Sequence, residues 1–440
     1  MTQSDIATAP AAPAQGIGPD TISRTVLPNG TVVLIYPNHA IPAVNITWSC
    51  EAGAVFEPAE RNGLAGFTAR LMRRGTKRQT FERLNQETEE RGMSVGVDAG
   101  RHTLSVGGRS LAEDTRFLID TIADIARHPA FPLDEIEKLR TLILTGLKEE
   151  EDDTRSMAER AFRELAYPAD HPYHRRVSGT LDTVPLIQRA DMLGFYRGFV
   201  RPDTAIIVIV GDVDPAATLR MVEDAFGDWA AAGPRPAAVV PDAPRPTTTA
   251  RAMQVLAGKT QNDLVLGLPG IRRADPDYYA MQMMNLLLGR LGLYGRLGRS
   301  VREEQGLAYY AYSSFDAGRG PGPWAVRAGV NPTNVQRAVA SILREITRIR
   351  EEPVAEKELA DGTTFLTGVL PLQLETNSGL AGVLFDMEFY GLGLDYVQRY
   401  PAIIRGLTIA DVQRAAQRYL PAEAYVLGVA GPEVELASEA

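Results

Sequence analysis

The sequence predicts an α+β protein built from two similar domains, and three observations carry this prediction. Strand-like apolar runs and amphipathic helical stretches follow one another without regular βαβ alternation. A segment rich in proline, residues 230–250, interrupts the pattern halfway along the chain. The two halves also end alike, because residues 190–212 align with residues 410–432. A long-range duplication of this kind indicates two domains of one fold.

The composition narrows the classes of function. The chain has 440 residues, of which 45% are hydrophobic, and a net charge of −9. This acidic balance disfavours nucleic acid or an anionic membrane as the main partner. Cys50 is the only cysteine, so the chain has no intrachain disulfide and no CxxC site. We expect Cys50, which follows a strand-like run, to be a small buried hydrophobic residue.

The first twenty residues contain neither a basic segment nor an apolar core, so they do not read as a secretory signal. Their alanine, proline, glycine and serine content favours a disordered tail. No apolar run approaches the roughly 20 residues of a membrane span. We therefore expect a cytoplasmic protein. The proline-rich segment divides it into an N-terminal domain over residues 21–229 and a C-terminal domain over residues 251–440.

Periodicity and residue type define the expected elements of each half. In the first half we expect strands at 30–37 and 43–50, helices at 61–76 and 80–92, a strand or hairpin at 93–110, helices near 112–128, 133–150, 155–166 and 184–200, and a buried strand at 204–213. In the second half we expect strands at 252–258 and 262–270, a helix at 277–289, a further strand from Leu307, and then more helices.

The helix expected at 61–76, "RNGLAGFTARLMRRGT", has an unusual centre. Its apolar residues recur at helical spacing, but Gly66 lies in the middle, where glycine costs roughly 1 kcal/mol relative to alanine. Arg70 follows one turn later on the face that Gly66 leaves bare. Close packing of Gly66 against a neighbouring element would be one explanation.

A family resemblance offers another. The segments "NGLAGF…LMRRGT", "HPYHRRVSGT" and "VREEQGLAYYAYSSF", together with the duplicated endings, resemble the M16 metallopeptidase family from about Thr21 to Gly431. The resemblance implies that each domain is a mixed, mostly antiparallel sheet with helices packed on one face. Active members of the family carry an inverted zinc motif, H-x-x-E-H, where this chain has "GLAGFTARLM", and a third zinc ligand, a glutamate, in a following helix.

By this resemblance, Gly66 and Arg70 stand at the two histidine positions and Ala69 at the glutamate. The third ligand position falls at Gly146, or at Glu149 if the alignment slips by a few residues. Glycine and alanine have no donor atom, and arginine stays protonated and has no lone pair for a metal. We therefore expect no metal cofactor in this chain.

The second half retains a different family feature. "GRSVREEQGLAYYAYSSF" predicts a helix end through Gln305, a Gly306 cap and a strand. Arg302 and Tyr309 match an Arg/Tyr pair that, in the family, projects towards the zinc site and donates hydrogen bonds to the substrate carbonyl. Without the resemblance, the two residues read as an ordinary helix C-terminus and ordinary strand packing.

The resemblance thus implies a non-catalytic subunit of a heterodimeric zinc peptidase. Arg302 and Tyr309 would act in the active site of a homologous partner that carries the zinc motif and its zinc, and an extended peptide would add a strand to a sheet edge. The alternative is a structural or peptide-binding pseudoenzyme, such as a homodimer, without a role in hydrolysis. A third hypothesis is an independent hydrolase that uses His171, His174 and some of residues 149–153.

The remaining candidate sites carry weaker signals. "HPYH" gives His171 and His174, but the flanking prolines predict a loop and a structural role. We expect the other histidines to be surface or strand residues; they are His39, His102 and His128. "LAGKT" lacks the earlier glycine of a phosphate loop, and "GRLGLYGRLGRS" reads as a glycine-rich turn between helices.

Overall fold

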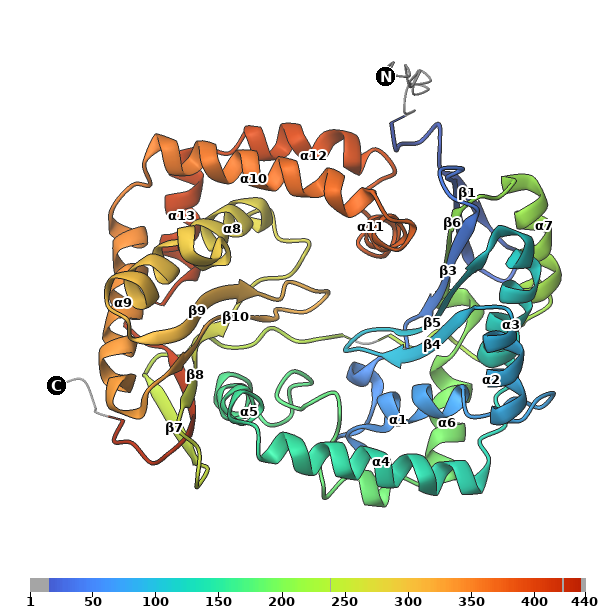
Figure 1. The fold of residues 1–440 in the computed structure, drawn as a ribbon, viewed down its shortest axis with the longest axis horizontal. Helices are drawn as coiled ribbons and strands as arrows, with labels where there is room; N and C mark the ends of the chain where they lie inside the picture. Colours follow the sequence, from blue (N-terminus) through green and yellow to red (C-terminus); the bar gives the residue numbers. More distant parts are fainter. Residues whose placement is uncertain (1–15, 238, 422, 437–440) are drawn as a thin grey trace, which may run out of the picture.

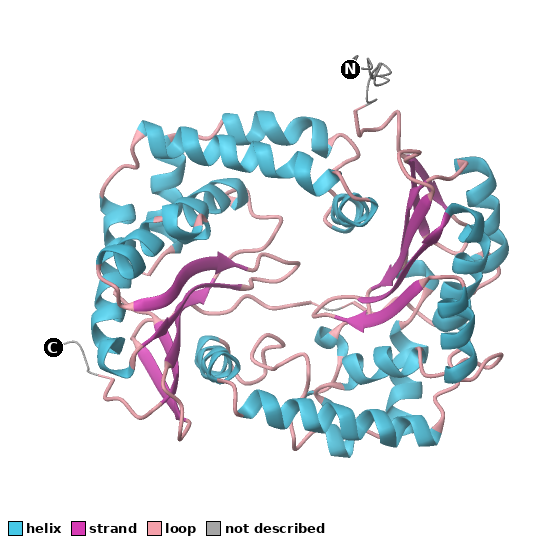
Figure 2. Ribbon diagram, in the orientation of Figure 1, coloured by secondary structure: helices cyan, strands magenta, loops and turns pink. Residues whose placement is uncertain are grey.

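The computed structural model describes residues 16–237, 239–421 and 423–436, so the expected tail lies largely outside the described residues. Two sheets face each other across the molecule, one from each half of the chain (Figure 1). Most helices lie on the outer sides of the two sheets, and two further helices lie nearer the centre of the view (Figure 2).

The first sheet has the strand order β1-β2-β6-β3-β5-β4. Its strands are β1 (Ser23–Val26), β2 (Val32–Pro37), β3 (Ala43–Cys50), β4 (Ser94–Ala99), β5 (Leu104–Leu111) and β6 (Ile206–Gly211). Only the pairing of β2 with β6 is parallel within it. The stretch expected as a strand or hairpin is the antiparallel pair β4–β5.

The second sheet has the order β7-β11-β8-β10-β9. Its strands are β7 (Ala250–Val255), β8 (Asn262–Pro269), β9 (Ala308–Phe315), β10 (Pro323–Val330) and β11 (Val426–Gly431). Here too one pairing, β7 with β11, is parallel and the others are antiparallel. The prediction of two mixed, mostly antiparallel α+β domains is confirmed.

The helices of each half pack mainly on one face of their own sheet. Those of the first half are α1 (Leu64–Met72), α2 (Phe81–Glu90), α3 (Thr115–Arg127), α4 (Leu133–Glu151), α5 (Thr154–Ala166), α6 (Arg189–Phe199) and α7 (Pro215–Phe226). Those of the second half are α8 (Tyr278–Asn285), α9 (Val335–Glu351), α10 (Glu356–Leu374), α11 (Asn377–Phe389), α12 (Tyr396–Arg405) and α13 (Ile409–Tyr419). Two π-helical segments, η6 (Leu286–Arg290) and η8 (Gly298–Glu304), flank the glycine-rich turn.

The duplicated endings perform the same structural tasks. Asp191 is the N3 residue of α6 and accepts the Gln188 amide at 2.8 Å, while Asp411 is the N3 residue of α13 and accepts the Thr408 amide at 2.9 Å. Each Asp therefore forms half of a capping box. The final glycines of β6 and β11 have φ of 152° and 140°, where a side chain would strike the neighbouring strand.

One helix from each half crosses to the other sheet. Helix α5 covers the second sheet on β11 and β8, and α11 covers the first sheet on β6 and β3 (Figure 1). Both crossings are apolar: Phe162 of α5 packs with Val426, and Leu384 of α11 packs with Val208. Because β6 and β11 are buried on both faces, their sequences are continuous apolar runs.

The proline-rich segment joins the two halves and packs against the rest of the protein. Val240 is buried in the same apolar cluster as α5, and the carbonyl of Pro241 lies 3.1 Å from Nε2 of His171. Throughout the described ranges, no helix combines the length and the hydropathy that crossing a bilayer would need.

Candidate functional site

A buried carboxylate fixes the start of α1, the helix with the unusual centre. Oε1 of Glu57 accepts the Asn62 side-chain amide at 2.7 Å and the Gly63 backbone amide at 2.9 Å, and Oε2 accepts the Ala65 amide at 2.9 Å. These amides would otherwise be unpaired at a helix N-terminus. Burial raises the pKa of Glu57, an effect that the hydrogen bonds from Ala65 and Gly63 oppose. The sequence analysis missed Glu57, whose only signal is a carboxylate shortly before the helix.

The positions that match the three zinc ligands open into one cavity of about 430 Å³. Gly66 and Arg70 reach it from α1, and Gly146 reaches it from α4. Glu149, the alternative for the third ligand position, is exposed and does not line this cavity. The structure therefore brings Gly66, Arg70 and Gly146 together, as the unslipped alignment requires.

Packing does not require glycine at these positions. A Cβ on Gly66 would meet only the Val177 carbonyl, at an ordinary 3.7 Å, and a Cβ on Gly146 would have nothing within 4 Å. Both residues lie inside helices, so neither needs a left-handed backbone. Close packing, the other explanation for Gly66, does not account for it.

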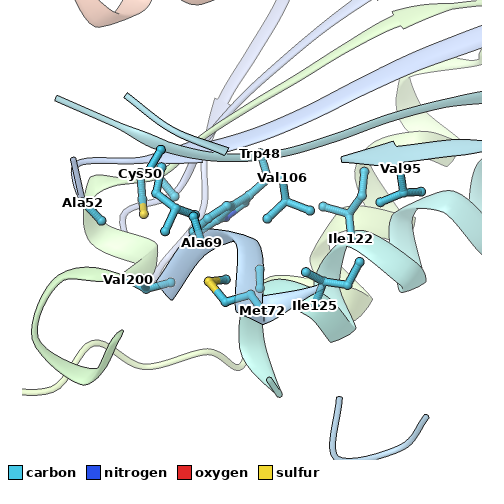
Figure 3. Packing of buried hydrophobic residues seen from close by; sticks show 14 of the residues in the cluster. Trp48, Cys50, Ala52, Ala69, Met72, Val95, Val106, Ile122, Ile125 and Val200 are labelled. Carbon is cyan, nitrogen blue, oxygen red and sulfur yellow. The ribbon is translucent and has the colours of Figure 1, made fainter. Parts of the chain in front are cut away.

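Ala69 has a different environment from the other motif positions. It is fully buried and packs with Trp48, Cys50 and Met72 between α1 and the first sheet (Figure 3). Cys50 is itself buried, as expected, and burial raises the pKa of its thiol. The face of α1 that carries Ala69 thus contributes to the core.

The residues at the cavity do not fit a zinc ion. A catalytic zinc site requires three protein ligands, commonly histidine with a carboxylate. The carboxylates here are Asp98 and Glu150, and Glu150 forms an ion pair with Arg176. Arg70 adds a permanent positive charge. Over the described part of the chain, no three His, Cys, Asp or Glu side chains are grouped so as to hold a metal.

Arg302 and Tyr309 lie on the other half, on consecutive elements η8 and β9. Gly306 has φ of 61° and turns the chain between them, and the Leu307 amide donates back to the Val301 carbonyl at 3.0 Å. The expected helix end, glycine cap and strand are therefore present, with a π-helical last turn. Both side chains are exposed, Tyr309 by 68%. Neither has an ion-pair or hydrogen-bond partner among the residues that the structure describes.

The "HPYH" segment is a loop, as expected, and its histidines hold the loop together. Nδ1 of His171 accepts the Tyr173 amide at 3.0 Å, and Nδ1 of His174 lies 2.9 Å from the Tyr167 carbonyl. His171 is buried beneath the proline-rich segment. These contacts give both residues a structural role.

His102 was expected on the surface or in a strand, and that expectation is wrong. It lies half-buried in the turn between β4 and β5, with Nε2 2.6 Å from the Tyr173 hydroxyl. Burial and the neighbouring Arg101 lower its pKa to about 4. Of the other two histidines, His39 is exposed, as expected, and pairs with Asp212 at 2.6 Å. His128 is instead half-buried at the C-terminal cap of α3.

The fold and the site together define a class: a two-domain peptidase-like α+β protein whose metal positions lack ligands. The family model described as "Insulinase (Peptidase family M16)" matches residues 32–179, and "Peptidase M16 inactive domain" matches residues 186–363. The chain belongs to the M16 peptidase family, as a member without the inverted zinc motif.

Related proteins align with this chain over nearly its whole length. An uncharacterized zinc protease of Streptomyces coelicolor is 26% identical and aligns over 95% of this chain and 90% of its own. A non-peptidase homolog of Helicobacter pylori is 22% identical, with 90% and 91% covered. Among solved structures, an M16 inactive domain from Pseudomonas fluorescens has a TM-score of 0.87 at 23% identity, covering 94% of this chain and 98% of its own. That last likeness establishes the fold.

Proposed function

We propose that this chain is the non-catalytic subunit of a heterodimeric, zinc-dependent M16 peptidase that resides in the cytoplasm. One observation carries the proposal: the metal positions have no ligands, while Arg302 and Tyr309 are exposed and uncommitted. An arginine and a tyrosine kept free of internal partners are available to a substrate or to another subunit.

In this role, the Arg302 guanidinium and the Tyr309 hydroxyl donate hydrogen bonds to the substrate carbonyl in the partner's active site. Donors aimed at the oxygen that becomes negative lower the barrier more than they strengthen substrate binding. The partner, a homologous chain with an intact H-x-x-E-H motif, supplies the zinc. Strand β9 carries Tyr309 and is the last strand of its sheet. Its edge is covered at Ser313, whose carbonyl accepts the Asn285 amide, so an extended peptide would add along the part of the edge towards Tyr309.

The experiment has two stages. The chain is first purified from its native host to identify a co-purifying chain with the intact motif. Peptide cleavage by the reconstituted pair is then compared for wild type, Arg302→Gln and Tyr309→Phe. Each variant is expected to lower kcat by about 10²-fold or more, the scale for losing one oxyanion donor.

Arg337→Gln is the matched control, because Arg337 is an exposed arginine of α9 and loses the same charge. Its activity should equal that of wild type. Unchanged kcat in both Arg302→Gln and Tyr309→Phe, with the pair assembled, would contradict the proposed role.

The second candidate is a structural or peptide-binding pseudoenzyme, in hetero-oligomers or as a homodimer. The relative named as a non-peptidase homolog favours it. Under this function, no partner with a zinc motif co-purifies, and there is no turnover for the substitutions to lower.

A further inference from the structure

A second cavity, of about 470 Å³, lies where the two halves meet. It is lined from the first half by α5 and the segments around Arg101 and Arg176, and from the second half by β8, β9 and β10. Six arginines line it against three carboxylates: Arg101, Arg155, Arg160, Arg163, Arg176 and Arg327 against Glu150, Glu159 and Asp263. The cavity is therefore strongly positive in a chain whose net charge is −9.

The carboxylates of this arginine cavity are already committed. Glu159 binds Arg163 and Arg327, each at 2.8 Å, and Glu150 pairs with Arg176. Asp263 accepts the hydroxyls of Thr154 and Tyr310 and the Gln261 amide. Its distance to Arg155 is long, 3.9 Å. Arg160 pairs with Glu164, an acid outside the lining, at 2.8 Å. Among the described residues, the lining arginines without a close acid partner are therefore Arg155 and Arg101.

Arg101 is the lining arginine that has no acidic partner within the described chain. It forms no ion pair with any carboxylate of the described residues. Its guanidinium group donates to the carbonyls of Pro172 and Arg175, both at 3.4 Å, and its guanidinium carbon lies 4.8 Å from the ring centre of Tyr173. Burial, and then Arg163, lower its pKa to about 10. Arg101 is half-buried, and a guanidinium in such a place without an acid partner is costly, so an anionic ligand would stabilise it.

The position of the cavity indicates the class of anion. It shares Glu150 and Val177 with the cavity at the zinc-motif positions, so the two cavities adjoin. Tyr310 and Tyr312 line it from β9, the strand that also carries Tyr309. A peptide added along β9 would therefore pass the arginines, whose planar guanidinium groups bind carboxylates through paired hydrogen bonds.

We propose that the arginine cavity binds the carboxylate side chains of acidic peptides, with Arg101 as the central contact. The inference rests on the proposed function only in taking the ligand to be a peptide. Its test is accordingly a binding measurement on the isolated chain, which needs neither a partner nor turnover, so the two proposals fail separately.

The probe is a short fluorescein-labelled peptide rich in glutamate, followed by fluorescence anisotropy, with its glutamine counterpart as the neutral comparison. We expect the glutamate peptide to bind at least about tenfold more tightly, since hydrogen bonds between charged groups are stronger than those of a neutral amide. Arg101→Gln should weaken its binding by about tenfold or more, and Arg101→Lys by less, because lysine keeps the charge.

Arg155→Gln covers the case in which Arg101→Gln does not fold, because the Arg155 side chain is 67% exposed. It should weaken binding in the same direction, while Arg337→Gln on α9 should not. Equal affinity for both peptides, or equal loss in Arg337→Gln and Arg155→Gln, would overturn the proposal. So would displacement of the peptide by inorganic phosphate where sodium chloride of equal ionic strength is ineffective, since the ligand would then be a phosphate group.

Discussion

Gly66 and Gly146 have no side chain where their helices pass the same cavity, and the exposed Arg70 also lines it. Neither glycine has a positive φ or a contact that forbids a Cβ. The physical cost of glycine in a helix is therefore not offset by packing. What these three residues share is the inability to bind a metal.

The first prediction concerns stability. Gly66→Ala and Gly146→Ala should each raise the free energy of unfolding by about 0.5–1 kcal/mol, because alanine loses less conformational entropy in a helix. Gly63→Ala is the control and should destabilise, since Gly63 has φ of 96° and its Cβ would lie 2.9 Å from Gly179. Urea unfolding measures all three. Destabilisation by Gly66→Ala would mean that the fold itself requires this glycine.

The second prediction concerns the positions of the ligands. Adding Gly146→Glu to the double variant Gly66→His and Arg70→His should strengthen zinc binding at least about tenfold, because a third ligand completes the set that a zinc site needs. A competition titration against a chelating indicator measures it. The double variant retains Glu149 and serves as the control. Equally tight zinc binding by the double variant would make Glu149 the third ligand position instead.

At the scale of elements, α1 is capped and packed although its motif positions carry no metal ligand. Glu57 fixes its first turn, and Ala69 and Met72 keep its core face packed. This separation explains how the site can be lost without loss of the fold: the ligand positions face the cavity, and the apolar positions face the sheet.

The exchange of α5 and α11 leads to the third prediction. Leu384→Ala removes a fully buried side chain of α11 from the face of the first sheet and should cost about 2–5 kcal/mol. Leu372→Ala on α10 is the control, because Leu372 is 61% exposed and should cost little. Chemical unfolding followed by circular dichroism measures both. If Leu384→Ala costs no more than Leu372→Ala, α11 does not tie the halves together.

The sequence was informative where a local pattern has a single structural solution. The Asp and Gly shared by the two endings predicted a common helix and strand, and these form equivalent capping boxes and strand ends. The exchange of α5 and α11 could not be predicted, because an apolar helix face does not specify which sheet it covers. The arginine cavity was missed for the same reason, since Arg101 and Arg327 meet only through the tertiary fold.

For the molecule as a whole, the two halves share a fold but differ in their candidate functional residues. The first half has the peptidase fold around motif positions that carry no metal ligand, and the second half leaves Arg302 and Tyr309 exposed. Under the proposed function, Arg302 and Tyr309 contribute to catalysis only in a complex with a zinc-bearing partner. The net charge of −9 is compatible with the binding of an acidic peptide, because positive side chains are concentrated in the arginine cavity.

The most direct test is to measure zinc content and peptide cleavage for the isolated chain, and then for its mixture with the co-purifying M16 chain that carries the intact motif. The account predicts neither zinc nor cleavage in the isolated chain, and cleavage by the mixture that a chelator abolishes. Stoichiometric zinc in the isolated chain, together with chelator-sensitive cleavage, would contradict it.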